Sequence, residues 1–300
     1  MTKFTMASQQ APVLVGVIGG SGVYKMEMLK NTEQVTISTP FGAPSDQITI
    51  ATLHGIRCAF IPRHGRNHTL TPTEVNYRAN IFAFKTLGVK YLISVTAVGS
   101  LKEDRKPGDL VVVDQLIDQT KNRVSTFFGN GIVAHVPFGH PTCQKFNKLA
   151  VDAITKALPG VKVHPAGTLV TMEGPVFSTK AESLFHRQIG GDLIGMTTAT
   201  ESKLAREAEM AHLCVAMVTD MDAWLDEDHV DVEKVIKTLT ENAAHAQVYL
   251  SAIIEEIAKN PFQSDAHDAL KVAIMTKPEL VPFPIKRDLA PLIGRYLPYQ

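Results

Sequence analysis

The sequence predicts an α/β fold, a single domain in which helices flank a central, mostly parallel twisted sheet. Apolar runs of strand length alternate with amphipathic helical segments along the chain. The run 213–218 is almost entirely apolar, which is typical of a strand covered on both faces of a parallel sheet. The 300 residues contain no repeat and no linker. We therefore expect one domain over residues 13–276, between a leader and a tail.

Composition excludes several classes of function. Lys and Arg together number 30, as do Asp and Glu, so the formal net charge of zero indicates neither a nucleic-acid partner nor a membrane surface. No apolar run approaches the roughly 20 residues that a membrane span needs. The three cysteines are widely spaced, which is typical of reduced thiols inside a cell. Residues 1–12 lack the apolar core of a signal peptide, so we expect a disordered leader and a cytoplasmic protein.

In the first half of the chain, each expected element is bounded by a turn signal. The strands are short apolar runs that end at Gly, Pro or polar residues. The helix has apolar residues along one face, Thr73 as its expected cap and Gly88 after its end. In order, we expect a strand at 13–18, a hairpin of strands at 47–53 and 57–61 around His54-Gly55, a helix at 73–87, and strands at 91–95 and 110–113.

The second half continues the alternation after the loop-like residues 119–142. Its last helix has the most regular apolar period in the chain. In order, we expect a helix at 143–158, a strand at 168–172, a helix at 180–188, a strand at 192–195, a helix at 199–209, a strand at 213–218 and a helix at 232–257. Residues 277–300 form a Pro-rich apolar tail, which we expect to dock on the body or on a neighbouring subunit, since it otherwise exposes much apolar surface.

Polar groups follow five of the expected strands. Ligands of open α/β sheets bind just beyond the carboxyl ends of the strands. Four of these ends offer hydroxyls, glycine N–H groups, a guanidinium or an imidazole, which suit an oxyanion, and the fifth is acidic. In order, the groups are Ser21 within Gly19-Gly20-Ser21-Gly22, Arg63 with His64, Thr96, Thr197, and the acidic Thr219-Asp220-Met221-Asp222.

Each of these features also has a plain structural interpretation. The glycine spacing is not that of a dinucleotide fingerprint, so phosphate binding and a tight structural turn remain the alternatives there. His64 and His68 have a spacing that metal ligands use, but the intervening Gly65 and the missing Glu of a zinc-protease helix argue against a metal. A solvated basic turn is the alternative at His64, and a solvated acidic turn at Asp220 and Asp222.

A site with an oxyanion at one end and carboxylates at the other suits glycosyl transfer to phosphate. Phosphate attacks the anomeric carbon while a protonated carboxylic acid assists a basic leaving group. The positive charge that develops on the sugar lies between the two ends.

Six segments of the chain, in this order, are similar to those of one known family. They are Gly19-Gly20-Ser21-Gly22, Pro62-Arg63-His64-Gly65-Arg66-Asn67-His68, Glu74-Val75-Asn76-Tyr77-Arg78-Ala79-Asn80, Thr96-Ala97-Val98-Gly99-Ser100, Glu173-Gly174-Pro175-Val176-Phe177-Ser178 and Met196-Thr197. Over nearly its whole length the chain resembles the trimeric purine nucleoside phosphorylases, and Thr219-Asp220-Met221-Asp222 resembles the S-methyl-5′-thioadenosine phosphorylase branch. The resemblance implies a homotrimer with active sites near subunit interfaces, phosphate as co-substrate, and no metal or organic cofactor.

The resemblance also implies a role for individual residues. Asp220, when protonated, would donate to purine N7, its pKa raised by burial and by Asp222. Asp222 would accept a hydrogen bond from the 6-amino group of adenine, whereas a 6-oxo purine would set a carbonyl against it. The remaining roles are phosphate binding by Ser21, Arg63, His64, Thr96, Ala97 and Thr197, packing of Met196 on the ribose and Phe177 on the base, and substrate binding by Thr219.

Further positions bear on specificity. Ser178 stands where relatives that act on inosine and guanosine have Glu. Val232, Val235 and Ile236 would form an apolar wall that favours a methylthio group over a hydroxyl, by about 1–2 kcal/mol for one buried methyl-sized group. A neighbouring subunit would complete this pocket near His135 or Leu280. Gly195 and Val176 depart from the branch pattern, so the expected substrates extend from methylthioadenosine to adenosine and other 5′-modified nucleosides.

Three alternative functions remain. A 6-oxopurine or methylthioinosine phosphorylase would share the fold and the phosphate site. A nucleoside hydrolase would release the base without phosphate. A catalytically silent nucleoside-binding or scaffold protein would keep the fold without turnover.

Overall fold

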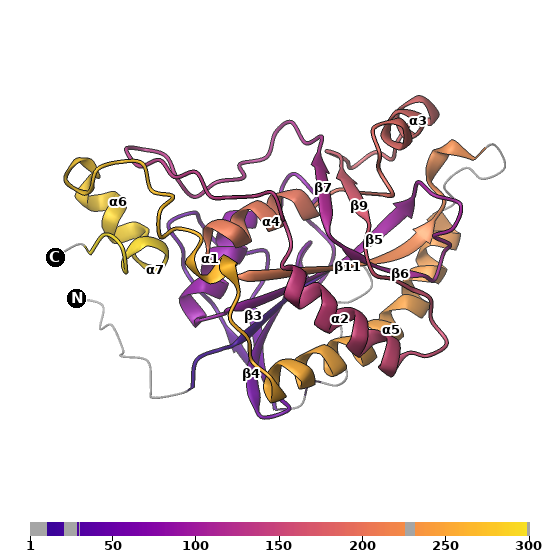
Figure 1. Cartoon of the computed structure of the whole chain (residues 1–300), viewed down its shortest axis with the longest axis horizontal. Helices are drawn as coiled ribbons and strands as arrows, with labels where there is room; N and C mark the ends of the chain where they lie inside the picture. Colours follow the sequence, from indigo (N-terminus) through magenta and orange to yellow (C-terminus); the bar gives the residue numbers. More distant parts are fainter. Residues whose placement is uncertain (1–10, 21–28, 30, 226–231, 299–300) are drawn as a thin grey trace.

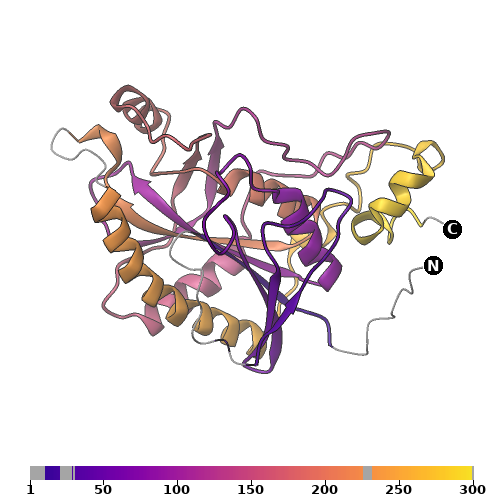
Figure 2. The same ribbon diagram turned by 180° about the vertical axis from the view of Figure 1, so that it is seen from behind.

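The computed structural model of the chain describes residues 11–20, 29, 31–225 and 232–298, and only the backbone of residues 232–237. Within this part, eleven strands form one sheet with helices on both faces (Figure 1). Helices α2 (Gln144–Ala157) and α5 (Val232–Lys259) cover one face. Helices α1 (Tyr77–Leu87) and α4 (Thr198–Glu207) cover the other, as the view from behind also shows (Figure 2). The predicted fold class is confirmed.

The sheet is built around two long central strands, β5 (Tyr91–Ser100) and β11 (Ala211–Asp220). They pair in parallel from Ala211 opposite Tyr91 to Val218 opposite Val98. On the far edge of β5, the parallel strand β1 (Val15–Gly19) pairs as far as Ser94, and β10 (Leu193–Gly195) pairs antiparallel from Gly99. Residues 95–98 of β5 therefore have no described strand partner on that edge, which leaves their backbone open to a ligand.

The other strands extend the sheet on both sides. Beyond β1 lie β4 (Ile56–Pro62), β3 (Ile48–Leu53) and β2 (Glu33–Val35). Beyond β10 lie β9 (Thr168–Thr171) and β7 (Gln115–Asp118), and β11 also pairs with β6 (Leu110–Val113), which pairs with β8 (Val163–His164). The sequence did not predict the short strands β2, β7 and β8.

Two of the predicted strand ends are wrong. The strands expected at 91–95 and 213–218 continue to Ser100 and Asp220 and so include Thr96, Thr219 and Asp220. These polar residues stay extended because pairing between β5 and β11 satisfies their backbone, and only a β-bulge between Val218 and Asp220 interrupts it. The polar side chains thus lie within rigid strands.

The predicted helices are confirmed, with shifted ends. In order they are α1 (Tyr77–Leu87), α2 (Gln144–Ala157), α3 (Lys180–Gln188), α4 (Thr198–Glu207) and α5 (Val232–Lys259). The expected cap Thr73 is wrong, because α1 begins at Tyr77 and the side chain of Asn76 accepts a hydrogen bond from the N–H of Ala79. Gly88 ends α1 in the left-handed conformation, as predicted. None of the described helices is both long and apolar enough to cross a membrane.

The tail folds into two short helices, α6 (Phe283–Asp288) and α7 (Ala290–Ile293). Its buried side chains Leu289, Leu292 and Ile293 belong to the same apolar cluster as Ile81 and Phe82 of α1. The described part of the tail therefore packs on the body of its own chain. Leu280 and Phe283 remain exposed.

Candidate active site

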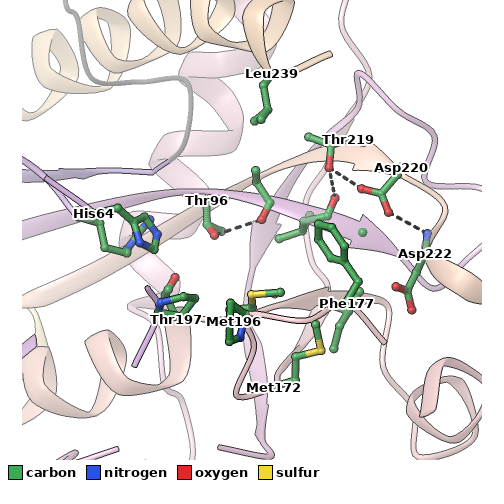
Figure 3. Close-up of a pocket in the computed structure, with 18 of the residues that line it drawn as sticks. His64, Thr96, Met172, Phe177, Met196, Thr197, Thr219, Asp220, Asp222 and Leu239 are labelled. Carbon is green, nitrogen blue, oxygen red and sulfur yellow. Dashed lines mark hydrogen bonds between the residues drawn. The ribbon is translucent and has the colours of Figure 1, made fainter. Parts of the chain in front are cut away.

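A cavity of about 260 Å³ lies at the carboxyl ends of β4, β5 and β11 (Figure 3). Ten of the residues predicted for the site line it: Arg63, His64, Thr96, Ala97, Phe177, Met196, Thr197, Thr219, Asp220 and Asp222. Ser21 and the side chains of Val232, Val235 and Ile236 lie outside the described residues. The cavity has a basic end and an acidic end, separated by the apolar side chains of Met196 and Phe177.

Arg63 supplies the positive charge of the basic end. It follows the last apolar residues of β4 and is buried. Burial disfavours its charge, but the Glu201 carboxylate overcomes this and holds the pKa of Arg63 above its usual value. The guanidinium also donates to the backbone oxygen of Val95 at 3.2 Å. A permanent cation is thereby fixed at the open stretch of β5.

His64 is oriented by the backbone and is uncharged. Its Nδ1 lies 2.8 Å from the carbonyl oxygen of Leu70, which only accepts, so Nδ1 carries the proton. Burial, with a smaller effect of the adjacent Arg63, lowers the pKa of His64 to about 4. At neutral pH, Nε2 is therefore an acceptor, suited to a hydroxyl group of hydrogen phosphate.

The N-terminus of α4 completes the basic end. Thr197 is the cap residue of this ten-residue helix, and its side chain makes no capping bond, so its hydroxyl is available to a ligand. The free N–H groups and the dipole of a helix N-terminus favour an anion. With Thr96 and Ala97 on the open edge of β5, these groups form a pocket for a tetrahedral oxyanion.

Asp220 and Asp222 form the acidic end. Thr219 Oγ1 lies 2.6 Å from Asp220 Oδ1, and the backbone N–H of Asp222 donates to Asp220 Oδ2 at 3.0 Å. Asp222 has a φ of 49°, in the left-handed region. Its carboxylate accepts a hydrogen bond from Ser183 of α3.

Burial raises the pKa of both carboxyl groups. For Asp220, the hydrogen bonds from Thr219 and from the N–H of Asp222 act in the opposite direction. We expected Asp222 to help raise the pKa of Asp220, but its backbone N–H lowers it. The negative charge of Asp220 instead adds to the raised pKa of Asp222. The pair therefore holds a proton more readily than carboxylates in water.

Several residues of the site were missed by sequence analysis. Ser183 and Leu239 lie on helices whose apolar period gives no sign of a ligand. Met172 follows β9, and Ser178 Oγ lies 3.5 Å from its sulfur atom. Ser178 itself is buried and does not line the cavity, but its side chain forms a hydrogen bond with Asp222. Only the tertiary structure brings these positions together.

Arg123 is another missed residue, and it holds the loops around the cavity. It donates to the backbone oxygens of Met196 at 2.9 Å and Glu173 at 2.6 Å, and its side chain is 2% exposed. Its Nε lies 3.1 Å from the Glu173 carboxylate. This residue comes from the segment expected to be loop-like, where no periodic pattern marks a buried side chain.

The two departures from the branch pattern differ in position. Gly195 lines the cavity, and an added Cβ would meet no atom closer than 3.4 Å. A Cβ at this position would make ordinary contacts with Val98 and Leu169, so alanine would fit there. Val176 is 80% exposed and does not line the cavity.

The fold and the two-ended cavity define the class of this protein. Residues 14–255 match the family model of the phosphorylase superfamily. S-methyl-5′-thioadenosine phosphorylase of Synechocystis sp. (strain PCC 6803 / GT-S) is 53% identical over 286 residues, which cover 95% of this chain and 88% of the relative. The enzyme of that name from Chloroflexus aurantiacus is 54% identical over 284 residues, 94% of this chain and 98% of the relative. The chain belongs to the S-methyl-5′-thioadenosine phosphorylase family within this superfamily.

Solved structures agree with this assignment. A methylthioadenosine phosphorylase from an antarctic soil metagenomic library has a TM-score of 0.90 at 46% identity, covering 94% of this chain and 99% of that one. Methylthioadenosine phosphorylase from Schistosoma mansoni, solved with adenine, has a TM-score of 0.79 at 36% identity, covering 83% and 92%. The family predicted from the sequence is confirmed.

Proposed function

We propose that the protein catalyses the phosphorolysis of S-methyl-5′-thioadenosine to adenine and S-methyl-5-thio-α-D-ribose 1-phosphate. The observation that carries this proposal is one cavity that joins a buried guanidinium and a helix N-terminus to the carboxyl groups of the half-buried Asp220 and the buried Asp222. Two relatives that are 53% and 54% identical to this chain are named for this activity. Adenosine and other 5′-modified nucleosides are further expected substrates, because Gly195 and Val176 depart from the pattern of the methylthioadenosine branch.

The reaction forms one bond and breaks one. A phosphate oxygen bonds to C1′ of the sugar while the C1′–N9 bond breaks and its electron pair passes to adenine. Asp220 donates its proton to N7, so adenine leaves as a neutral molecule. Burial raises the pKa of Asp220 above its usual value, which favours the protonated form that this step requires.

Asp222 favours a 6-amino purine. Its carboxylate accepts a hydrogen bond from the amino group, while the carbonyl of a 6-oxo purine would face a second acceptor. Ser178 stands where 6-oxopurine enzymes have a glutamate, and its uncharged hydroxyl suits adenine N1, which carries no hydrogen. A 6-oxopurine or methylthioinosine phosphorylase is therefore the less favoured alternative, and the intact oxyanion end disfavours both a hydrolase and a silent scaffold.

The assembly and surroundings of the enzyme are part of the proposal. Exposed apolar side chains at Val133, Met275, Leu280 and Phe283 support a homotrimer in which a neighbour covers them and completes the site near His135 or Leu280. Phosphate is the co-substrate, no metal or organic cofactor takes part, and the enzyme works in the cytoplasm. Ser21 would bind phosphate, and Val232, Val235 and Ile236 would contact the methylthio group.

The decisive experiment measures adenine release from methylthioadenosine with and without phosphate, beside inosine. We expect release that requires phosphate and leaves inosine largely uncleaved. Release without phosphate would make the protein a hydrolase, and a preference for inosine would overturn the role of Asp222. The variant Asp220→Asn should lose turnover but keep phosphate affinity, and light scattering should give a mass near three times the 32.7 kDa of the chain.

A further inference from the structure

Nearly all N–H donors of the Arg63 guanidinium are already used in hydrogen bonds within the protein. A guanidinium carries five N–H donors. Its Nε and Nη2 donate to the two oxygens of Glu201, and Nη1 and Nη2 each donate to the backbone oxygen of Val95 at 3.2 Å. Four N–H groups are thus used by described residues. The fifth, on Nη1, has no acceptor among the described residues, and Arg63 lines the cavity, where this N–H can serve a ligand.

Glu201 is itself held from behind. Ser94 Oγ donates to its Oε2 at 2.7 Å and lies 2.9 Å from His212 Nε2. Because the hydroxyl gives its only proton to the carboxylate, Nε2 of His212 must be the donor in the second contact. The other ring nitrogen, Nδ1, is buried with no hydrogen-bond partner among the described residues. His212 is therefore neutral, in keeping with burial that lowers its pKa to about 4.

These hydrogen bonds form a series in which each donor points towards the carboxylate of Glu201. His212 donates to Ser94, Ser94 donates to Glu201, and Arg63 donates to Glu201 from the other side. The three residues behind Arg63 are all at most 2% exposed. They lie on β5, β11 and α4, and none of them lines the cavity. They can therefore affect a ligand only indirectly, either through Arg63 or through the position of α4.

We propose that Glu201, held by Ser94 and His212, is a positioning residue that presents Arg63 to the oxyanion through a single N–H group. The inference rests on the proposed function in one respect, that this oxyanion is the co-substrate phosphate. Glu201 also balances the charge of Arg63, so phosphate is bound by directed hydrogen bonds more than by net charge. Misplacement of the guanidinium should then weaken phosphate and leave the nucleoside end unaffected.

The rival view is that the buried ion pair only fastens α4 to the sheet. A fastening role would lower the melting temperature and shift Thr197 and Met196 together, because Thr197 caps α4 and Met196 directly precedes it, so the binding of phosphate and of nucleoside would both weaken. A positioning role raises the KM for phosphate but leaves the KM for methylthioadenosine unchanged. The ratio between the KM for phosphate and the KM for methylthioadenosine therefore distinguishes the two.

Two variants and one control provide the test. Glu201→Asp keeps the charge but withdraws the carboxylate by one methylene, and Ser94→Ala removes only the support behind it. Glu207→Gln is the matched control, since Glu207 is buried on the same helix but accepts from the N–H of Phe127 and from Thr126. We would measure KM for both substrates, kcat, melting temperature, and calorimetric binding of inorganic phosphate to the free protein.

We expect Glu201→Asp to raise the KM for phosphate about tenfold, the size of one lost hydrogen bond to a charged group. Ser94→Ala should raise it about threefold. The KM for methylthioadenosine should stay within about twofold in both, and Glu207→Gln should change neither value. An unchanged KM for phosphate in folded Glu201→Asp, or a parallel rise of both KM values, would overturn the proposal.

Two further outcomes are separable. If Glu201→Asp does not fold, the comparison of KM values in Ser94→Ala decides, and an unchanged phosphate KM there would count against the proposal. If the wild-type protein releases adenine without phosphate, the proposed function fails. Calorimetric titration of phosphate into the free wild-type and variant proteins then still tests whether Glu201 sets oxyanion affinity.

Discussion

The substitution Asp222→Asn should shift the preference of the enzyme from 6-amino towards 6-oxo purines. Asp222 occupies the left-handed region with a φ of 49°, which Asn tolerates about as well as Asp. The amide oxygen of Asn can still accept the hydrogen bond from Ser183. The turn should therefore survive, and only the group facing the base should change.

The magnitude follows from the hydrogen bonds involved. A hydrogen bond to a charged acceptor contributes about 1.5–3 kcal/mol. Its loss should lower kcat/KM for methylthioadenosine about 10- to 150-fold. For methylthioinosine, the amide nitrogen of Asn becomes a donor to the 6-oxo group in place of an opposed acceptor, so kcat/KM should rise. The ratio of the two values should then change by at least about tenfold.

The assay compares steady-state kcat/KM for the two nucleosides at saturating phosphate. Asp222→Ala is the matched control, because it removes the same acceptor but places Ala in a conformation that costs about 1–2 kcal/mol, which should lower the melting temperature. A folded Asp222→Asn enzyme with an unchanged substrate ratio would refute the reasoning, since the 6-position of the base would then not face Asp222.

Three other predictions concern stability. Gly20→Ala should lower the free energy of unfolding by about 1–3 kcal/mol in denaturant titrations, because the new Cβ would lie 2.6 Å from the backbone oxygen of Val95. An unchanged free energy of unfolding would contradict this close approach of Gly20 to β5. Burial raises the pKa of Glu207 from 4.5 to about 7, so the neutral carboxyl stabilises the fold below pH 4.5 and this stabilisation is lost as the pH rises through 7. At pH 8 the free energy of unfolding of Glu207→Gln should therefore exceed that of the wild type by up to about 3 kcal/mol, and this difference should shrink towards pH 5. The same difference at both pH values would contradict the raised pKa of Glu207. Asn76→Ala removes the cap on the N–H of Ala79 and the hydrogen bonds from its amide to the backbone oxygens of Phe41 and Ala43, so it should lower stability by at least about 1 kcal/mol, measured as a fall in melting temperature. Thr73→Ala should lack this cap effect.

Much of the fold was readable from the sequence because burial in a sheet or against a helix leaves a local period. The long apolar runs predicted β5 and β11, and the 3.6-residue period predicted α5. Prediction failed where local patterns mislead. Polar residues such as Thr96 and Asp220 signalled strand ends, yet pairing carries the strands past them. Thr73 looked like a cap, whereas Asn76 is placed to accept from the helix.

The sequence by itself determined which polar groups lie near the carboxyl edge of the sheet, because polar residues that follow apolar runs come from parallel strands that point to a common edge. Ala97, Phe177 and Met196 were added by the resemblance to the family, and ten of the predicted site residues line one cavity. Only the tertiary structure decided what holds those groups in place. Glu201 meets Arg63 across 138 residues of sequence, and Ser183 meets Asp222 across 39. A periodic pattern shows which face of a helix is buried but not which side chain it meets, because that depends on how distant elements pack.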